Sequence, residues 1–511
     1  MAERQEVGES RRAARYCVTS LDLSDNAIEG DNLTALAELL DGCSRRRLGR
    51  CDLPLDELKL ENTMHRTLTT VSWAAFRAFV IAAFGVAGDN RNRNCLKRLS
   101  LAHNSLNYHH VACICSALRC EGTTIEELSL ARTFSLLDPA DRRLCWQWLA
   151  IGLRPTIPRD GGTGLRRLDL SNNPLFPLES DAWLNCLRDP QKTVVHSTEL
   201  YSLPVKASPR LRIIEKEVQE ANLRAESKEW EVLASLDGWL CVIVPGFGVV
   251  WTKAKHAMSW EHDEEGVPSA SAVLSELVMN GMADSRTTTE ALENFLGGFG
   301  GRLQSLELRR NALSAMDLDA ILAGCRELHT LDVEGCRILQ LQLLVDALGG
   351  DLGQHLRTLN LNANLVGADS VNVLAAALRG LAHDHAPVLQ ELRVAHNEIG
   401  ANGVRHLHAA LEANKQLTLL ELDLPNEGAE APRRPDDDEY IQLYRTRCMR
   451  LDVSFQNELL GVSPLPADRK LAFLLMLNTR DVVLDPGICS VIFDFAADEK
   501  RRRILWNSAH S

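Results

Sequence analysis

A short phrase of regularly spaced leucines recurs along this chain and constrains its fold more than any other feature. One copy runs from Leu165 to Leu175 and another from Leu303 to Leu313, and both fit the pattern L-x-x-L-x-L-x-x-N-x-L. Further copies begin at Val18, Leu55, Leu96, Ile125, Leu328, Leu356, Leu389 and Leu417. A phrase repeated in this way predicts a solenoid of stacked units, because one unit alone cannot bury its apolar face.

Each position of the phrase has a physical role. Its apolar residues alternate, as at Leu168 and Leu170, which predicts a short strand with one buried face. The asparagine falls where the chain leaves the strand, and its amide can satisfy backbone groups of the neighbouring coil. Thr63, Thr133 and Cys336 occupy that position in three copies, where we expect looser turns.

The residues that follow the phrase predict helices. In the segments 372–378 and 404–411, apolar residues recur at helical spacing. A strand followed by a helix, repeated along a chain, gives a parallel sheet with right-handed crossovers.

The later copies carry a longer version of the pattern. The copy that begins at Leu389 continues through Gly403 to further leucines at helical spacing. This pattern resembles the ribonuclease-inhibitor class of leucine-rich repeats, which also occurs in NOD-like receptor sensor regions and in Ran GTPase activators. The resemblance covers residues 16–190 and 301–426. It implies an α/β fold: a horseshoe-shaped leucine-rich repeat solenoid with a parallel concave sheet and outer helices, plus a small C-terminal helical module.

The repeats and their interruptions divide the chain into six segments. They are a disordered N-terminus (1–15), N-terminal leucine-rich repeats (16–190), an irregular insertion with a helix and an apolar hairpin (191–300), C-terminal leucine-rich repeats (301–426), an acidic linker (427–450) and a helical cap or docking module (451–511). The linker is rich in proline and aspartate, which predicts an exposed connection.

The insertion contains elements that do not follow the phrase. Apolar spacing predicts a charged helix over 210–236 and a helical stretch over 272–279. The apolar run 239–251 is too short for a membrane helix and is interrupted by a Pro-Gly pair, which predicts a hairpin. Two interpretations stay open for residues 238–265: a genuine insertion, or translated sequence that the mature transcript lacks.

Composition limits the partners and the compartment. The net charge of −13 argues against nucleic acid and anionic membranes as main partners. The 14 cysteines lack paired metal-binding spacing, so we expect buried thiols rather than zinc sites or disulfides. The N-terminus lacks an apolar signal region, and with the cysteines this favours the reducing cytoplasm.

Signatures of enzymes and of cofactor sites are missing from the sequence. There is no G-x-x-x-x-G-K-[ST] phosphate loop, no H-E-x-x-H and no G-x-S-x-G. We interpret the pairs His383/His385 and His406/His408 as solvated, because the first lies in a loop and positions i and i+2 of a helix point apart. We therefore predict no catalytic residues, no metal and no cofactor.

The concave face of the sheet is the candidate binding surface. Strand side chains alternate, so residues between and just beyond the core leucines face the concave side. The acids at these positions are Asp22, Glu57, Glu61, Glu127, Asp169, Glu307, Asp332, Glu334, Glu391, Glu421 and Asp423, and the bases are Lys59, Arg98, Arg167, Arg309 and Arg393.

Acids thus outnumber bases on this face by 11 to 5. Either the sheet simply shares the acidity of the whole protein, or it attracts a protein partner with a basic surface. For the second interpretation we predict contacts from Asp22, Glu61, Asp169, Glu307, Arg309, Asp332, Glu334, Glu391, Arg393, Glu421 and Asp423.

The C-terminal module also leaves two interpretations open. Residues 468–477 and 487–496 are predicted to be helices. They either cover the last repeat, as solenoid ends require, or dock another protein. Leu484, Ile492 and Phe495 are faintly similar to F-box helices, which recruit ubiquitin ligases.

The predicted function is a non-enzymatic scaffold or recognition protein that binds a protein partner on the concave face. One alternative is a GTPase activator resembling the Ran activator, although only the repeat frame is shared and the long acidic tail of those activators is absent. The other alternative is a substrate adaptor for ubiquitin ligation, which rests on the C-terminal pattern.

Overall fold

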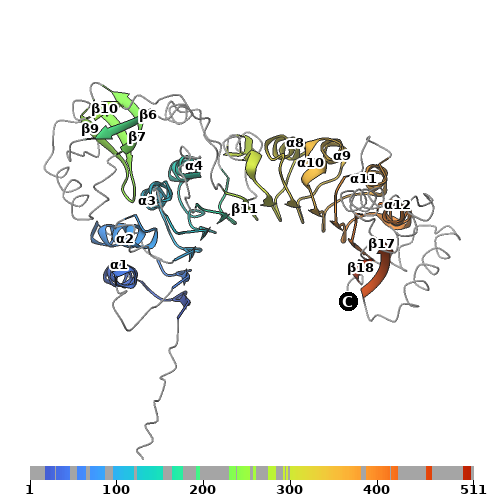
Figure 1. The fold of residues 1–511 in the computed structure, drawn as a ribbon, viewed down its shortest axis with the longest axis horizontal. Helices are drawn as coiled ribbons and strands as arrows, with labels where there is room; N and C mark the ends of the chain where they lie inside the picture. The colour runs from blue at the N-terminus through green and yellow to red at the C-terminus, as the bar shows by residue number, and fades with distance from the viewer. Residues whose placement is uncertain are drawn as a thin grey trace, which may run out of the picture. The chain divides into compact units, whose positions relative to one another are not determined.

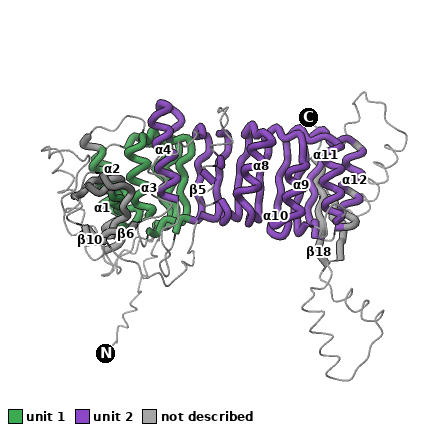
Figure 2. The backbone as a smooth tube through the Cα atoms, turned by 90° about the horizontal axis from the view of Figure 1, so that it is seen from above, with its two compact units in different colours: residues 1–133, 157–165, 182–272 green, residues 134–156, 166–181, 273–511 purple. Residues whose placement is uncertain are grey.

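The computed structural model describes the repeats and parts of the segments between them. The described residues are 18–28, 30–45, 55–64, 70–86, 96–119, 123–153, 164–175, 191–195, 229–236, 239–253, 257–259, 274–282, 292–293, 295–296, 300–380, 387–414, 416–423, 456–462 and 499–507. The chain divides into two compact units (Figure 2). Unit 1 comprises residues 1–133, 157–165 and 182–272, and unit 2 comprises residues 134–156, 166–181 and 273–511.

Unit 1 contains short parallel strands alternating with helices. The strands are β1 (Ser20–Asp22), β2 (Glu57–Lys59), β3 (Arg98–Ser100) and β4 (Glu127–Ser129), and the helices are α1 (Gly30–Arg45), α2 (Thr70–Ala83) and α3 (Tyr108–Leu118). The strands pair in this order, with the central leucine of each at the same register. That leucine is buried in β2, β3 and β4 and half-buried in β1, the end strand of this unit.

Unit 2 repeats the same arrangement. Its strands are β5 (Arg167–Asp169), β11 (Glu276–Val278), β12 (Ser305–Glu307), β13 (Thr330–Asp332), β14 (Thr358–Asn360), β15 (Glu391–Arg393) and β16 (Leu419–Asp423). Its helices are α4 (Pro139–Leu153), the 3-10 helix η2 (Gly300–Arg302), α8 (Ala315–Gly324), α9 (Gln342–Leu348), α10 (Asp351–His355), α11 (Ala368–Leu378) and α12 (Gly400–Ala413). The strands pair in parallel from β5 to β16, again with a buried leucine in register.

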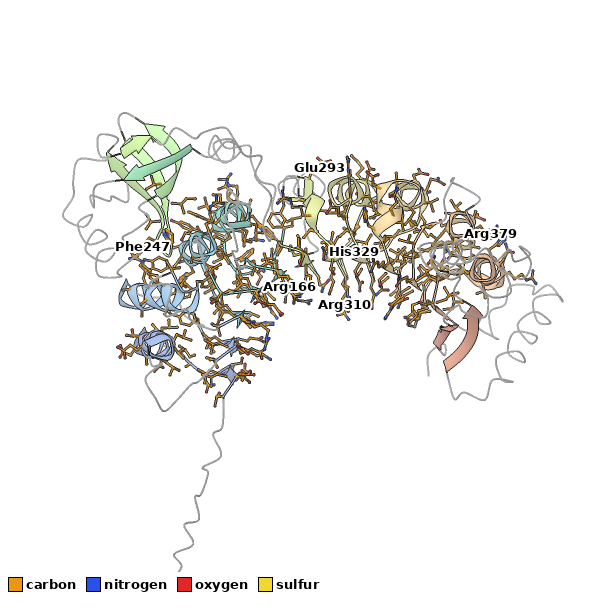
Figure 3. The ribbon with its side chains drawn as sticks, viewed as in Figure 1. Arg166, Phe247, Glu293, Arg310, His329 and Arg379 are labelled. Carbon is orange, nitrogen blue, oxygen red and sulfur yellow. The ribbon has the colours of Figure 1, made fainter. Side chains whose placement is uncertain are left out.

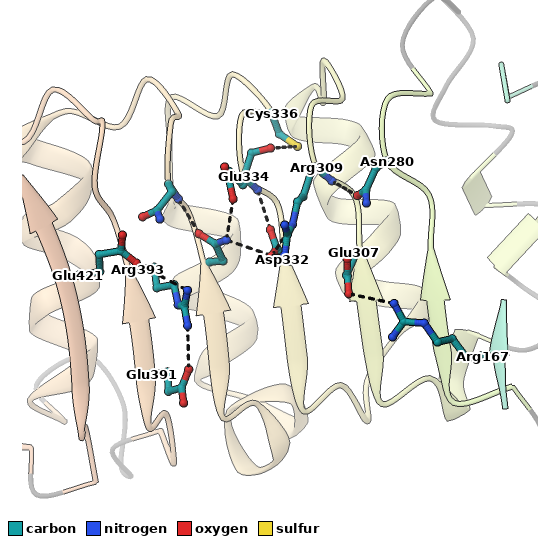
Figure 4. A network of polar contacts seen from close by, with 12 residues as sticks. Arg167, Asn280, Glu307, Arg309, Asp332, Glu334, Cys336, Glu391, Arg393 and Glu421 are labelled. Atoms are coloured by element: carbon teal, nitrogen blue, oxygen red, sulfur yellow. Dashed lines mark hydrogen bonds and ion pairs between the residues drawn. The ribbon is translucent and has the colours of Figure 1, made fainter. Parts of the chain in front are cut away.

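One face of this sheet is covered by helices, and none of the described helices covers the other. Helices α8, α9, α11 and α12 lie along one side of the strands (Figure 1). The middle residue of each strand is buried toward that side, and most of the outer residues are only half-buried. We call the opposite side the helix-free face; it is formed by these outer residues of β5 and β11 to β16, together with Arg309 and Glu334, which lie two residues after β12 and β13 (Figure 4).

The asparagine of the phrase links neighbouring coils. Asn311 Oδ1 accepts the backbone N–H of Met282 at 2.6 Å. Its Nδ2 donates to the carbonyl oxygens of Met279 and Leu308 at 2.8 and 2.7 Å. The same bonding recurs at Asn104, Asn364 and Asn397. Each amide therefore satisfies backbone groups that the packing of repeats removes from water.

The looser turns expected at Thr63, Thr133 and Cys336 are not observed. The residue before each of them has a φ of 53°, 56° or 69°, against 54° to 62° in the other copies. Thr63 Oγ1 and Thr133 Oγ1 each donate to the carbonyl oxygen three residues earlier, at 2.9 and 2.7 Å, which closes the turn. Cys336 Sγ donates at 2.9 Å to the carbonyl oxygen of Leu308 in the preceding repeat. The prediction was wrong because a hydroxyl also closes this turn and a thiol also links the coil to the preceding repeat.

Part of the insertion forms an antiparallel sheet within unit 1. Its strands are β6 (Gln191–Val195), β7 (Glu229–Leu236), β8 (Trp239–Val244), β9 (Gly248–Lys253) and β10 (Ala257–Ser259), in the order β10-β6-β7-β8-β9. The strands β8 and β9 pair along their whole length through the turn 245–247. The helix expected over 210–236 is wrong for residues 229–236, because β7 pairs with both β6 and β8. Residues 210–228 lie outside the described residues.

The turn between β8 and β9 is hydrogen-bonded to α3. Ser116 Oγ accepts the backbone N–H groups of Gly246 and Gly248 at 3.1 and 3.0 Å. Cys113 Sγ donates to the carbonyl oxygen of Gly246 at 3.0 Å. All of these atoms are buried, so the turn is an integral part of the packing of unit 1.

Helix α2 holds the same turn by packing. Arg77 Cζ lies 4.4 Å from the ring centroid of Phe247, at the end of the hairpin (Figure 3). Gly246 has a φ of 77°, and a Cβ there would lie 2.6 Å from Ile81 Cγ1. Only glycine fits both constraints. These contacts pack the hairpin against α2 within unit 1.

Strand β11 belongs to a repeat that the sequence analysis missed. It pairs in parallel with β5 and β12, so the helical stretch expected over 272–279 is wrong. Met279 and Met282 stand where the phrase has its third leucine and its asparagine. The strand is nevertheless formed, because a buried methionine fills the place of a leucine.

The C-terminal segment contributes two strands to unit 2. The strand β18 (Glu499–Asn507) pairs in parallel with β16, and β17 (Gln456–Val462) pairs antiparallel with β18. Only helices were expected within residues 451–511, so that expectation was incomplete. The helices predicted at 468–477 and 487–496 lie outside the described residues.

Candidate functional site

The helix-free face of unit 2 carries more acidic than basic side chains (Figure 4). Its charged residues with described side chains are Asp169, Glu276, Glu307, Asp332, Glu334, Glu391 and Glu421, with Arg167, Arg309 and Arg393. Seven carboxylates therefore face three guanidinium groups. Such an imbalance produces a negative potential over the sheet.

A network around Asp332 occupies the middle of this face. Arg309 Nε donates to Asp332 Oδ2 at 2.9 Å, and Arg309 Nη2 lies 2.8 Å from the same oxygen. Asn360 Nδ2 donates both to Asp332 Oδ2 at 3.0 Å and to Glu334 Oε2 at 3.2 Å. The backbone N–H of Glu334 donates to Asp332 Oδ1 at 3.1 Å. The side chain of Asp332, only 8% exposed, is thus held by donors from three residues.

The surroundings of Arg309 favour its charged form. Burial lowers the pKa of Arg309, but the charge and hydrogen bonds of Asp332, with the charges of Glu307 and Glu334, raise that pKa by more. Its guanidinium is therefore a fixed cation among three carboxylates, and this part of the face keeps a net negative charge.

Arg167 bridges two carboxylates from neighbouring strands. Its Nη1 lies 3.0 Å from Glu276 Oε2, and its Nη2 lies 3.9 Å from Glu307 Oε1. Arg166 Nη1 also lies 4.0 Å from Glu276. These half-exposed pairs are weak individually, but they fix the orientation of the carboxylates across β5, β11 and β12.

Arg393 bridges two carboxylates at the other end of the face. It lies 3.6 Å from Glu391 and 3.8 Å from Glu421. Each of the three arginines of the helix-free face therefore already has a carboxylate partner within the chain. The remaining negative charge is available to attract cations from outside.

Unit 1 has a smaller polar cluster on its strands. Ser20 Oγ donates to Glu57 Oε2 at 3.0 Å, and Lys59 and Arg98 lie 3.6 and 3.7 Å from the same carboxylate. The hydrogen bond from Ser20, aided by the two cations, lowers the pKa of Glu57. The excess of acidic over basic side chains is smaller on the strands of unit 1 than on the helix-free face of unit 2.

The predicted contact residues are divided between the two units. Asp22 and Glu61 belong to unit 1, and the other predicted contact residues belong to unit 2. The residues predicted in unit 2 lie on its helix-free face, namely Asp169, Glu307, Arg309, Asp332, Glu334, Glu391, Arg393 and Glu421, and the side chain of Asp423 lies outside the description.

Sequence reasoning missed two contributors to this face. Glu276 was overlooked because its repeat was not recognised; the spacing of Leu274, Leu277 and Met279 would have revealed it. Asn360 was overlooked because only charged residues were counted. Its amide nevertheless connects Asp332 to the adjacent carboxylate.

Other chemistry is not evident within the described ranges. No group of three or more His, Cys, Asp or Glu side chains there is placed to hold a metal ion. Burial raises the pKa of Cys113, Cys325 and Cys336 to about 12, so these thiols stay protonated and unreactive. No helix of the described part has both the length and the apolarity to cross a bilayer. His383 and His385 lie outside the described residues.

Comparison with known proteins yields similar solved structures only. No protein-family model matches the chain, and no curated protein matches it. The leucine-rich repeat-containing protein LegL7 from Legionella pneumophila is 16% identical, with a TM-score of 0.36 over 83% of this chain and 97% of that one. An internalin (inlF) from Listeria monocytogenes is 11% identical, with a TM-score of 0.32 over 80% of this chain and 88% of that one.

A third similar structure is a chain of the Rad7 and Elc1 complex from yeast. It is 14% identical, with a TM-score of 0.28 over 80% of this chain and 87% of that one. The fold of this protein is identified by features of the chain itself. These are the recurring phrase, the parallel strands with leucines in register and the asparagine-linked turns. By these features the protein has the leucine-rich repeat fold.

Proposed function

We propose that this protein is a non-enzymatic scaffold or recognition protein that binds a protein partner on the helix-free face of unit 2. The observation that carries the proposal is the carboxylate excess on that face, organised around Asp332 and Arg309. A sheet face without covering helices offers an extended surface, which suits a macromolecule better than a small ligand.

The chemistry of the face favours a partner with basic side chains. The arginines of the face are paired within the chain, so an incoming lysine or arginine meets net negative charge. Charge of this kind speeds encounter and orients the partner, and salt screens it. The location would be the cytoplasm, which the cysteine content favours.

Capture of proteins by variants of the tagged chain tests this proposal. The face variant carries Glu307→Gln, Glu334→Gln, Glu391→Gln and Glu421→Gln. The control variant carries Asp319→Asn, Glu327→Gln, Asp346→Asn and Asp369→Asn, which remove the same charge from exposed acids in or beside the helices. We expect mass spectrometry to find a basic protein held by the parent chain and the control, and lost from the face variant. Equal capture by both variants would contradict the proposal.

A version of the chain that ends at Arg450 tests the two alternatives. Under the proposal it retains the partner. A partner that needs the residues after Arg450, together with ligase subunits, would favour the ubiquitin-ligase adaptor. Stimulated GTP hydrolysis by a captured GTPase would favour the GTPase activator.

A further inference from the structure

Three large apolar side chains of unit 2 are exposed in consecutive repeats. Met316 is 70% exposed, Leu339 is 62% exposed and Leu365 is 44% exposed. Met316 follows β12, Leu339 follows β13 and Leu365 follows β14, and each lies between its strand and the end of the first turn of the next helix. Single exposed hydrophobic residues are ordinary, but these three lie in successive stacked repeats, in the segment that leads from the strand into the next helix.

Backbone hydrogen bonds hold these segments side by side. The N–H of Leu365 donates to the carbonyl oxygen of Ile338 at 3.0 Å, and the N–H of Leu313 donates to that of Cys336 at 3.1 Å. Ile338 and Leu313 are buried, so the exposed residues sit on a packed base rather than on a loose loop. We call Met316, Leu339 and Leu365 the apolar edge.

The apolar edge adjoins the carboxylates of the helix-free face. Glu334 lies two residues after β13, and the chain reaches Leu339 five residues later, beyond the same turn. Arg310 and Arg337 are exposed in the turns between them, so the edge does not itself attract cations. The sheet thus offers negative charge, and the edge offers apolar contact.

We propose that the partner docks through one polypeptide segment that carries both basic and apolar side chains. Its basic side chains lie over Glu307 and Glu334, and an apolar side chain packs against the apolar edge. This inference rests on the proposed function and adds an anchor outside the sheet. Charge governs the rate of encounter, whereas burial of an apolar side chain slows dissociation.

A library of short random peptides displayed on phage is the probe. Peptides are selected on the full chain and then measured by fluorescence anisotropy against three variants. The edge variant carries Met316→Ser, Leu339→Ser and Leu365→Ser, and the sheet variant carries Glu307→Gln and Glu334→Gln. The control carries Val18→Ser and Leu39→Ser, which change exposed apolar residues of unit 1. Urea unfolding checks that each variant is folded.

We expect enriched peptides to combine Lys or Arg with Leu, Ile or Phe. The edge variant should weaken their binding by at least about tenfold, as loss of an apolar hot spot does, with an unchanged salt dependence. The sheet variant should flatten the salt dependence between about 0.01 and 0.15 M, where the Debye length falls from about 30 to about 8 Å. The control should bind as the parent chain does.

The two proposals fail in different ways. Unchanged binding by the edge variant, with a flattened salt dependence in the sheet variant, would overturn the apolar anchor and leave the proposed function standing. Enriched peptides without basic residues that bind the sheet variant unchanged would overturn both.

Discussion

One carboxylate oxygen of Asp332 receives both the Nε–H and the Nη2–H of Arg309, at 2.9 and 2.8 Å. Replacing Asp332 by alanine should lower the free energy of unfolding by about 1–3 kcal/mol, because the amide of Asn360 and the N–H of Glu334 lose a buried acceptor. Urea unfolding midpoints measure this loss. Glu391→Ala is the control, since its exposed ion pair should change stability by less than about 0.5 kcal/mol. Equal urea midpoints for the two variants would contradict a stabilising role of the network around Asp332.

The asparagine that links coils should matter most where it is buried. Asn311→Ala should destabilise unit 2 by about 3 kcal/mol or more, because three backbone groups lose their partner and each costs at least roughly 1 kcal/mol. Asn26→Ala changes the same repeat position in β1's copy, where the side chain is exposed and water replaces its bonds. We expect a shift below about 1 kcal/mol there. The thermal unfolding temperatures of both variants measure these two losses of stability.

The contact between Ser116 and the β8–β9 turn should protect the hairpin from local opening. In Ser116→Ala the N–H groups of Gly246 and Gly248 lose their acceptor, so their amide hydrogens should exchange faster with solvent. Hydrogen exchange read by mass spectrometry over residues 239–253 tests this. Ser105→Ala, at an exposed position, should leave the exchange unchanged. Unaltered exchange in the Ser116 variant would mean that the turn is held by packing alone.

Burial of His110 predicts a loss of stability in acid. Burial, with a smaller contribution from the neighbouring charge of His109, lowers the pKa of His110 to about 4. Below its ordinary pKa of 6.5 the unfolded chain binds a proton that the folded chain refuses, so stability falls as pH drops from about 6.5 to about 4. The loss should reach at most about 3 kcal/mol.

His110→Gln is the test of this pH dependence. Its urea midpoint should fall less steeply between these pH values than that of the parent chain, whereas the exposed His355→Gln should follow the parent. Parallel curves for all three proteins would show that other groups govern the acid sensitivity.

The repeats could be predicted because their signal is local. Leucines spaced as at Leu306 and Leu308 define the buried face of a strand without knowledge of distant residues. The same reasoning failed at β11, where Met279 and Met282 are buried but replace the leucine and the asparagine that the pattern requires. It failed also at Thr133, because turn closure needs a donor and not specifically an amide.

The candidate site was predictable only in part. Alternation along the strands was sufficient to place Glu307 and Asp332 on the same face. The bonds of Asn360 and the position of the apolar edge depend on contacts between repeats, which no single copy of the phrase specifies. The anchoring of the hairpin through Gly246 joins residues far apart in sequence, so the pattern could not reveal it.

Strands β5 and β11 pair in register, with Arg167 opposite Glu276, although the whole inserted sheet lies between them in the sequence. The entropy of closing such a connection grows only logarithmically with its length. The hydrogen bonds between β5 and β11 therefore depend little on the length of the polypeptide that connects the two strands. Segments of different length can therefore be inserted at this junction while the register of β5 and β11 stays the same, which suits the junction to the addition of new domains.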